Sequence, residues 1–346
     1  MRPTRAEARV DSEPDRVIES EIAMMGSART PMEMVARACP LCGSNDESSV
    51  FAKENFDPAR CDRYAFASRK LPEYMHYRLI QCATCDLVYA SPVPSTRALA
   101  KAYQEAAYDS KTESGFAART YSALLRPIIE KLPDRAGAMD IGAGDGRFLK
   151  QLVQLGFTGV VGVEASEAPV AAAADAVRPL IRRALFSAGD FPHSSFSLVT
   201  CFQTIEHVDQ PLELCRGVHR LLKPGGATLL VMHNRHAISA RVLGLRSPIF
   251  DIEHLQLFSR RSGQLLLERA GFQDIASRTI LNRYPLGYWL KLLPLPARIK
   301  SAALAVAART RAARLPIILP AGNLSLLGFK RATSPERRFS TLRHEE

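Results

Sequence analysis

From residue 135 onward, short hydrophobic runs alternate with stretches in which hydrophobic residues recur every three or four positions. The runs predict buried strands, and the stretches between them predict helices. Alternation of the two is typical of a parallel sheet with helices on both faces. The predicted strands are 138–141, 159–164, 181–185, 196–202, 227–232, 272–280 and 323–330. The predicted helices end at Leu155, Val177, Leu222 and Ala270.

The pattern before and after this region divides the chain further. The N-terminal segment is polar and has no sustained periodicity, which is typical of a disordered segment. Helical patterns over 96–108 and 116–131 precede the first strand. We therefore expect a disordered start (1–37), a cysteine-containing module (38–95), a helical lid or linker (96–134), the core (135–283), a basic apolar insertion (284–322), the last strand of the core (323–331) and a disordered tail (332–346).

The first core strand leads into a loop with three alternating glycines. Asp140 lies near the end of that strand, Gly142, Gly144 and Gly146 follow, and a helical pattern begins directly afterwards. Glycine permits unusual dihedral angles and close approach to a ligand, and a helix start offers free N–H groups. The second strand ends in Glu164, about 20 residues further on, where an acid typically binds ribose hydroxyls in doubly wound folds.

These residues resemble motif I of the class I S-adenosylmethionine-dependent methyltransferases. Three more segments are similar to motifs of that family and follow in its order: Asp190 with Phe191, residues 201–211 and residues 221–230. The resemblance implies an α/β, Rossmann-like sheet of seven strands, whose last strand inserts antiparallel beside the fifth. It also implies S-adenosylmethionine as the cofactor.

The resemblance implies roles for the glycine loop and for its acidic neighbours. Gly142, Gly144 and Gly146 would let the backbone approach the amino-acid portion of the cofactor. Asp140 would orient that loop or the cofactor's ammonium group. Glu164 would bind both ribose hydroxyls.

Three further residues complete the implied cofactor site. Asp190 would accept a hydrogen bond from the adenine amino group, and Phe191 would flank the adenine ring. Gln203, at the carboxyl end of the fourth strand, would line the face on which methyl transfer occurs.

Glu206 and His207 are the first candidates for catalysis, because they follow the fourth strand at the ligand-binding edge of the sheet. Histidine suits a general base at neutral pH, although a capping or structural role for His207 is equally compatible with the sequence. The segment resembles Glu-x-x-Glu-His of quinone-pathway O-methyltransferases, which binds a divalent metal, but Gln203 replaces the first Glu and is a weaker ligand. His254, with Glu253, is the next candidate.

Other side chains could approach the same edge of the sheet. His233 and His236 follow the fifth strand and rank lower, because either could be exposed to solvent. Tyr103, Tyr108 and Tyr121 could face the pocket from the preceding helices, although packing is the simpler interpretation for each.

Two C-x-x-C pairs predict a metal site in the N-terminal module. Cys39 and Cys42 form the first pair, and Cys82 and Cys85 form the second. Four thiolates suit tetrahedral, structural zinc, which has no open position for chemistry. The alternative is a set of unrelated cysteines with one redox-active pair. An N-terminal cysteine module before such a core resembles zinc-containing bacterial methyltransferases, including sugar C-methyltransferases.

The charge distribution points to an anionic partner. The net charge is +11, and the sequence from Ala276 to Pro335 holds no Asp or Glu. Within that range, the insertion 284–322 is apolar and basic, so it could contact a membrane surface, a partner or the substrate. No apolar run approaches the roughly 18 residues of a membrane span, and we expect a cytoplasmic protein, peripheral to the membrane if this contact forms.

The preferred function is methyl transfer to an oxygen or carbon of a small molecule such as a sugar, a glycan or a secondary metabolite. A nucleic-acid methyltransferase is the second hypothesis, and a non-catalytic zinc-containing interaction protein is the third. Against the second, the sequence has no Asn/Asp-Pro-Pro-aromatic motif, and Cys201 stands alone on the fourth strand. Against the third, the glycine loop and Glu164 are intact.

Overall fold

The computed structural model describes residues 33–45, 49–68 and 72–332. The predictions of disorder for 1–37 and 332–346 fall almost wholly outside these residues. Residues 33–37 lie inside them, and Met34–Val35 form strand β1.

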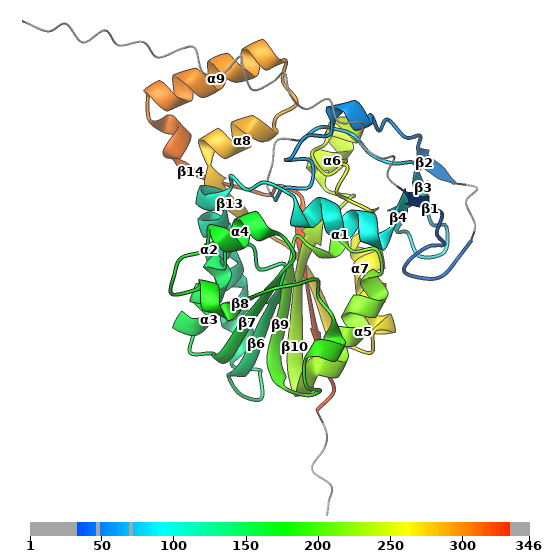
Figure 1. The fold of residues 1–346 in the computed structure, drawn as a ribbon, viewed down its shortest axis with the longest axis vertical. Helices are drawn as coiled ribbons and strands as arrows, with labels where there is room; N and C mark the ends of the chain where they lie inside the picture. The colour runs from blue at the N-terminus through cyan, green and yellow to red at the C-terminus, as the bar shows by residue number, and fades with distance from the viewer. Residues whose placement is uncertain (1–32, 46–48, 69–71, 333–346) are drawn as a thin grey trace, which may run out of the picture.

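A mixed sheet of seven strands forms the centre of the molecule (Figure 1). Its strands are parallel except for β15, which runs antiparallel to both of its neighbours. The prediction of a seven-stranded Rossmann-like sheet with an antiparallel last strand is therefore confirmed. In spatial order the strands are β12 (Gln273–Thr279), β15 (Asn323–Phe329), β10 (Leu222–His233), β9 (Phe196–Phe202), β6 (Ala136–Ile141), β7 (Thr158–Glu164) and β8 (Ile181–Arg183).

Helices cover both faces of this sheet (Figure 1). On one side lie α2 (Lys111–Ile129) and α3 (Arg147–Gln154), and on the other lie α5 (Pro211–Leu221) and α7 (Arg260–Arg269). Each face buries its own hydrophobic cluster. The central strand β9 is buried along its whole length, as expected for a strand that is covered on both faces.

The alanine-rich helix predicted to end at Val177 is shorter in the structure. Helix α4 covers only Glu167–Ala171 and is followed by turns. Val177 is buried, and its side chain lies where a Cβ on Gly146 would stand. The chain therefore leaves the helical path early and packs Val177 against the glycine loop.

The cysteine module does not form a complete sheet by itself. Its four-stranded sheet contains β2 (Val50–Ala52), β3 (Leu79–Gln81) and β4 (Val88–Ala90), and its edge strand β11 (Gln256–Leu257) comes from the core. Strand β1 pairs with β5 (Val93–Pro94). The expected boundary after residue 95 is a boundary in sequence, whereas in space the module and the core share a sheet.

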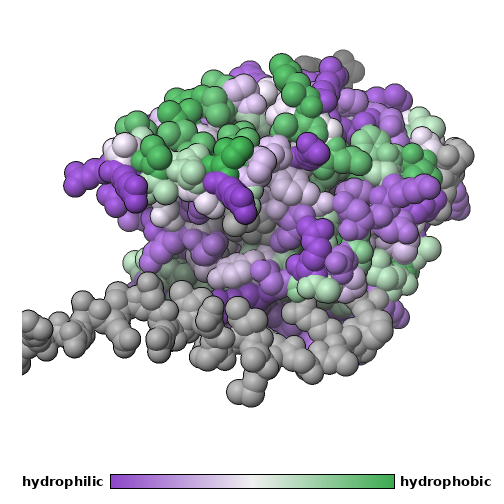
Figure 2. Space-filling model, turned by 90° about the horizontal axis from the view of Figure 1, so that it is seen from above, coloured by the Kyte–Doolittle hydropathy of each residue, from purple (hydrophilic) through white to green (hydrophobic). Residues whose placement is uncertain are grey.

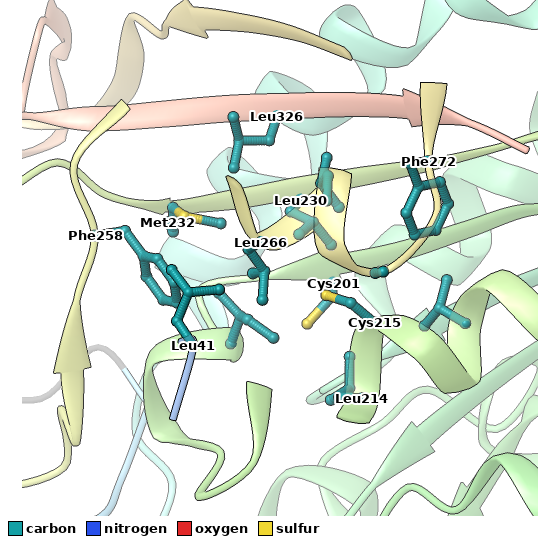
Figure 3. Close-up of a cluster of buried hydrophobic side chains, with 14 of the residues drawn as sticks. Leu41, Cys201, Leu214, Cys215, Leu230, Met232, Phe258, Leu266, Phe272 and Leu326 are labelled. Carbon is teal, nitrogen blue, oxygen red and sulfur yellow. The ribbon is translucent and has the colours of Figure 1, made fainter. Parts of the chain in front are cut away.

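One side chain of the module inserts into the hydrophobic core of the central sheet. Leu41, between the first two cysteines, is 1% exposed and lies beside Phe258, close to Met232 and Leu266 (Figure 3). Because burial of a leucine side chain contributes roughly 2 kcal/mol, this contact ties the module firmly to the core.

The remaining elements surround one end of the sheet. They are α1 (Thr96–Gln104), α6 (Ile238–Leu243), α8 (Leu286–Leu292), α9 (Ala297–Arg309) and the strand pair β13 (Asn282–Pro285) with β14 (Pro316–Leu319). This pair closes the insertion predicted for 284–322 and begins two residues before it. Short 3-10 turns occur at Pro58–Arg60, Arg178–Leu180, Ala188–Asp190, Ile205–His207, Gly244–Arg246 and Ala312–Arg314. Among the described residues, no helix has the length and apolar character that a membrane span requires.

Candidate active site

A cavity of about 1200 Å³ lies at the carboxyl ends of β6, β7, β9 and β10. Ligand pockets usually measure about 300–1000 Å³, so this one has room for two molecules. The strand ends form its floor, and helices α1, α2, α6 and α8 contribute to its walls. The carboxyl edge of the strands is where ligands bind in open α/β sheets.

The glycine loop and Glu164 meet on this floor. The Gly144 N–H donates a hydrogen bond of 2.8 Å to Oε2 of Glu164, and the Ser166 N–H donates one of 2.8 Å to Oε1. Burial raises the pKa of the Glu164 carboxyl. Gly144 has a φ of +56°, and a Cβ built on it would meet nothing within 4 Å. Its open side therefore leaves space for a ligand against the backbone.

The two flanking glycines have a different environment. A Cβ on Gly142 would stand 2.1 Å from Oγ1 of Thr204, and one on Gly146 would stand 2.5 Å from Cγ1 of Val177. Gly142 and Gly146 are thus required for packing as well as for positive φ. Of the three glycines, Gly144 is the one whose backbone borders open space.

Asp140 and Gln203 line the cavity near the loop. Asp140 is 3% exposed and accepts a hydrogen bond of 2.7 Å from the Thr200 hydroxyl. Gln203 has a φ of +51°, which is uncommon for a residue other than glycine. Its buried Nε2 has no hydrogen-bond partner among the described residues. A buried amide without a partner is an available donor for a ligand.

Asp190 and Phe191, predicted to contact adenine, are not among the residues that line the cavity. Asp190 instead forms an ion pair of 2.8 Å with Arg182. The Phe191 ring packs edge-on against Phe196, with 5.9 Å between ring centroids. Residues 184–186, which directly follow β8, line the cavity. Their position directly after a strand of the sheet is the sequence signal that could have identified this wall of the cavity. The adenine contact of Asp190 and Phe191 stays a prediction.

His207, His254 and Glu253 form a cluster on the opposite wall. Their potential ligand atoms lie within 4.8 Å of one another, so the cluster could also hold a cation. Nδ1 of His207 is 3.0 Å from the Tyr103 hydroxyl and 3.5 Å from Oε2 of Glu253. Tyr103, for which packing was the simpler interpretation, therefore contacts a candidate catalytic residue directly.

The protonated nitrogen of His254 is fixed by its partner. Nδ1 of His254 is 2.9 Å from the Ile249 carbonyl oxygen. A carbonyl can only accept, so this Nδ1 carries the hydrogen and Nε2 is left as the basic nitrogen of the neutral ring. The His207 and His254 rings meet edge to face at 5.0 Å.

His233 also belongs to this wall, although its sequence position gave it a lower rank. Its ring lies 5.0 Å from that of His254, and its Nδ1 is 2.8 Å from Oδ1 of Asn323. Burial lowers the pKa of His233 to about 4, against the smaller opposite effect of the bond to Asn323. His233 is therefore neutral near pH 7. His236, in contrast, is exposed.

Glu206 does not line the cavity, in contrast to its prediction as a catalytic residue. Its side chain is 0% exposed, and Oε1 accepts a hydrogen bond of 2.6 Å from the His233 N–H. Burial raises the pKa of Glu206 to about 7. The side chain points to the backbone at the end of β10, so its contact supports the position of His233.

The four cysteines predicted to bind metal come together. The sulfur atoms of Cys39, Cys42, Cys82 and Cys85 lie within 4.8 Å of one another, and two of the separations are 3.5 and 3.4 Å. Zinc–sulfur bonds of about 2.3 Å in a tetrahedron place sulfurs roughly 3.8 Å apart. The cluster therefore fits a four-thiolate metal site. Its geometry is compatible with zinc.

The chain is similar in sequence to known methyltransferases. Residues 113–277, just under half of the chain, match a family model described as a methyltransferase domain. The ubiquinone biosynthesis O-methyltransferase of Pseudomonas aeruginosa is 34% identical over 127 residues, which are 32% of this chain and 53% of the relative. The corresponding protein of Pseudomonas fluorescens is 33% identical over 107 residues, or 28% and 44%. The chain thus spans about half the length of the curated relatives it matches.

Two solved methyltransferase structures are among those similar to this chain. A methyltransferase from Archaeoglobus fulgidus is 16% identical, with a TM-score of 0.43, and the match covers 63% of this chain and 97% of that one. Phosphoethanolamine N-methyltransferase 2 of Haemonchus contortus, solved with S-adenosyl-L-methionine, is 18% identical with a TM-score of 0.41, over 70% and 63% of the two chains.

Proposed function

We propose that this protein is an S-adenosylmethionine-dependent methyltransferase that acts on a hydroxyl group of a small molecule. The observation that carries the proposal is the meeting of Gly144 and Glu164 at the floor of a cavity with room for two ligands. The match to a methyltransferase domain supports the reaction class. The likeness to O-methyltransferases supports oxygen over carbon or nitrogen as the acceptor atom.

The described residues fit the cofactor. S-Adenosylmethionine would supply an electrophilic methyl group on a sulfonium. Glu164 would exchange its contacts with Gly144 and Ser166 for the ribose hydroxyls, and the open side of Gly144 would accommodate the cofactor's amino-acid portion. Gln203 offers an unused N–H to the methyl-transfer face.

His207 is our candidate for the general base. Glu253, 3.5 Å from Nδ1 of His207, would orient the imidazole so that its other nitrogen receives the acceptor's proton. His254 lies against His207 with a basic Nε2 and would help to hold the acceptor hydroxyl. With a sulfonium methyl donor bound, His207 and His254 would supply much of the rate by positioning the acceptor hydroxyl for in-line displacement.

Two further assignments accompany this function. The four cysteines would hold one structural zinc ion, because four thiolates complete its coordination.

The insertion would contact an anionic membrane surface, since it has no acidic residue, and α9 exposes Ile299 and Val306 together with Arg298 and Arg309. The sides of Trp289 and Tyr288 that reach the cavity suit an acceptor with an apolar portion.

Methyl transfer can be measured with methyl-labelled S-adenosylmethionine and a panel of phenolic, sugar and lipid-linked hydroxyl compounds. We expect label in a hydroxyl acceptor and a rate lowered by roughly 10²–10⁴ in His207→Gln. Label found only in nucleic acid, or none above a Glu164→Ala control, would contradict the proposal. Activity that requires an added divalent cation would instead assign His207, Glu253 and His254 as metal ligands.

A further inference from the structure

We propose that the cysteine module positions the histidine wall of the cavity, and that Asp86 and Arg37 are the positioning residues that connect the two. This inference rests on the proposed function, because it takes His207, His233 and His254 as the acceptor-facing residues. It assigns the metal site a role in the geometry of the active site in addition to its role in holding the module together.

Asp86 connects the second cysteine pair to the loop after His233. It directly follows Cys85, and its N–H donates a hydrogen bond of 3.0 Å to the Cys82 carbonyl. Its carboxylate forms an ion pair with Nη2 of Arg235, and its carbonyl accepts a bond of 3.2 Å from Nε of the same side chain. Oδ2 is also 3.4 Å from Nε2 of His236.

The Arg235 side chain is only 6% exposed, so its pairing with Asp86 is screened little by solvent. A buried guanidinium without its partner would be costly. The loop from His233 to His236 is therefore held to the end of the cysteine knuckle.

Arg37 makes the equivalent connection from the first cysteine pair, two residues before Cys39. Its guanidinium donates hydrogen bonds of 2.8 Å to the Asp209 carbonyl and 2.7 Å to the Leu255 carbonyl. Asp209 lies two residues after His207, and Leu255 directly follows His254. One side chain beside the metal site thus fixes the backbone that follows two of the candidate catalytic histidines.

A strand pairing strengthens this connection. Strand β11 begins at Gln256, two residues after His254, and pairs with β4, which begins at Val88, three residues after Cys85. The Gln256 side chain donates bonds of 2.8 and 2.7 Å to the carbonyls of Ile205 and Val208, on either side of His207.

All three histidines are followed, within two residues, by a residue that contacts Arg37 or Asp86, the two residues next to the cysteine pairs. The contacts are Asp209 and Leu255 with Arg37, and Arg235 with Asp86. In contrast, Glu164 accepts its hydrogen bonds from the N–H groups of Gly144 and Ser166, which both belong to the core. A change at the metal site should therefore move the acceptor side of the cavity and leave the cofactor side in place.

The test uses the full chain with histidine labelled by ¹³C and ¹⁵N, followed by NMR, with signals assigned through single His→Gln variants. Arg235→Gln breaks the connection from the core side without changing a residue of the cysteine knuckle. Arg235→Lys keeps the positive charge, so its histidine signals should lie closer to those of wild type than the signals of Arg235→Gln do. Arg216→Gln, which breaks an exposed ion pair with Glu213 on α5, is the matched control. Metal content and affinity for S-adenosylhomocysteine are measured on the same samples.

We expect Arg235→Gln to retain about one metal ion per chain and an affinity for S-adenosylhomocysteine within about twofold of wild type. The ring signals of His233 should shift, with its titration midpoint moved by about half a pH unit or more. Arg216→Gln should leave them unchanged.

Unchanged histidine signals in metal-loaded Arg235→Gln would overturn the inference. Loss of the metal from this variant would overturn it too, because the pair would then support the metal site and not the histidines. Failure of the wild type to bind S-adenosylhomocysteine would instead contradict the proposed function, and the histidine signals would still report on the connection.

Discussion

The Gly144 N–H donates a hydrogen bond of 2.8 Å to the Glu164 carboxylate, across the gap between the ends of β6 and β7. The bond joins two adjacent parallel strands at the edge where ligands bind in α/β sheets. A carboxylate held by main-chain N–H groups in this way is poised to bind the hydroxyls of a ligand that displaces one of them.

The first prediction compares alanine at two glycines of the same loop. Gly142→Ala should lower the free energy of unfolding by about 3 kcal/mol, because its Cβ would collide with Thr204 in addition to the cost of positive φ. Gly144→Ala should cost only about 1–2 kcal/mol but weaken cofactor binding by about tenfold. Denaturant unfolding and calorimetry measure the two effects. Equal losses of cofactor affinity and of stability in the two variants would contradict the different roles that we assign to Gly142 and Gly144.

A second prediction concerns pH and the buried carboxyl of Glu206. Its pKa in the folded state is about 7, against an ordinary value of 4.5, so the folded protein binds the extra proton between these values. This group therefore makes the protein less stable as pH rises from about 4.5 to about 7. His233 has the opposite effect, because its lowered pKa of about 4 costs stability as pH falls from about 6.5 to about 4.

Glu206→Gln should separate these two effects. The amide oxygen can still accept from the His233 N–H, but the titration is removed. The stability of the variant relative to wild type should therefore increase between pH 5 and pH 8, by up to about 3 kcal/mol. Urea unfolding at several pH values measures this difference. A difference that is independent of pH would show that Glu206 is already ionised at pH 5.

The third prediction tests zinc. Cys82→Ser should lower metal affinity by more than about 100-fold and destabilise the protein, because metal-binding free energy contributes to folding. Cys61→Ser is the control, since Cys61 lies outside the four-sulfur cluster. Elemental analysis of the purified proteins should give about one zinc ion per chain for wild type and the control. Wild type purified without metal, or an ion retained by Cys82→Ser, would contradict the site.

The fourth prediction tests the membrane surface. In Figure 1, α9 lies at the far end of the molecule from the base of the sheet. Figure 2, which views the molecule from above, shows hydrophobic residues (green) next to hydrophilic ones (purple) on this face. Arg298→Glu with Arg309→Glu should reduce binding to vesicles containing an anionic lipid by at least tenfold, because each basic residue near such a surface contributes about 1 kcal/mol.

The control for this experiment is Lys131→Glu with Lys150→Glu, which makes the same change of charge at exposed residues next to α2 and on α3. Sedimentation with the vesicles compares the two double variants. Equal binding by both would show that only the net charge matters. No binding by wild type at low salt would contradict a membrane contact.

The sheet and the meeting of the glycine loop with Glu164 could be predicted from the sequence because their signals are local. Hydrophobic periodicity predicted all seven strands, and the glycine loop with Glu164 depends on residues at the ends of adjacent strands. The two cysteine pairs, about 40 residues apart, could also be predicted to meet. Each C-x-x-C pair supplies two of the four thiolates that a tetrahedral metal site needs.

The rest of the site depends on contacts between distant segments, which a single sequence does not reveal. Strand β11 pairs with residues about 170 positions earlier. Glu206 was predicted to be a catalytic residue, but its side chain accepts a hydrogen bond from the His233 N–H and does not line the cavity. Tyr103 contacts His207 only because α1 crosses the end of the sheet. In each case the direction of a side chain is set by tertiary packing.

Isothermal titration of the full chain with S-adenosylmethionine, compared with Glu164→Ala, tests the central claim most directly. We predict one site per chain in wild type and an affinity at least tenfold weaker in the variant, because hydrogen bonds to a charged group contribute about 1.5–3 kcal/mol. Circular dichroism should show that Glu164→Ala remains folded. Equal affinities in the two proteins, or no binding by wild type, would contradict the account.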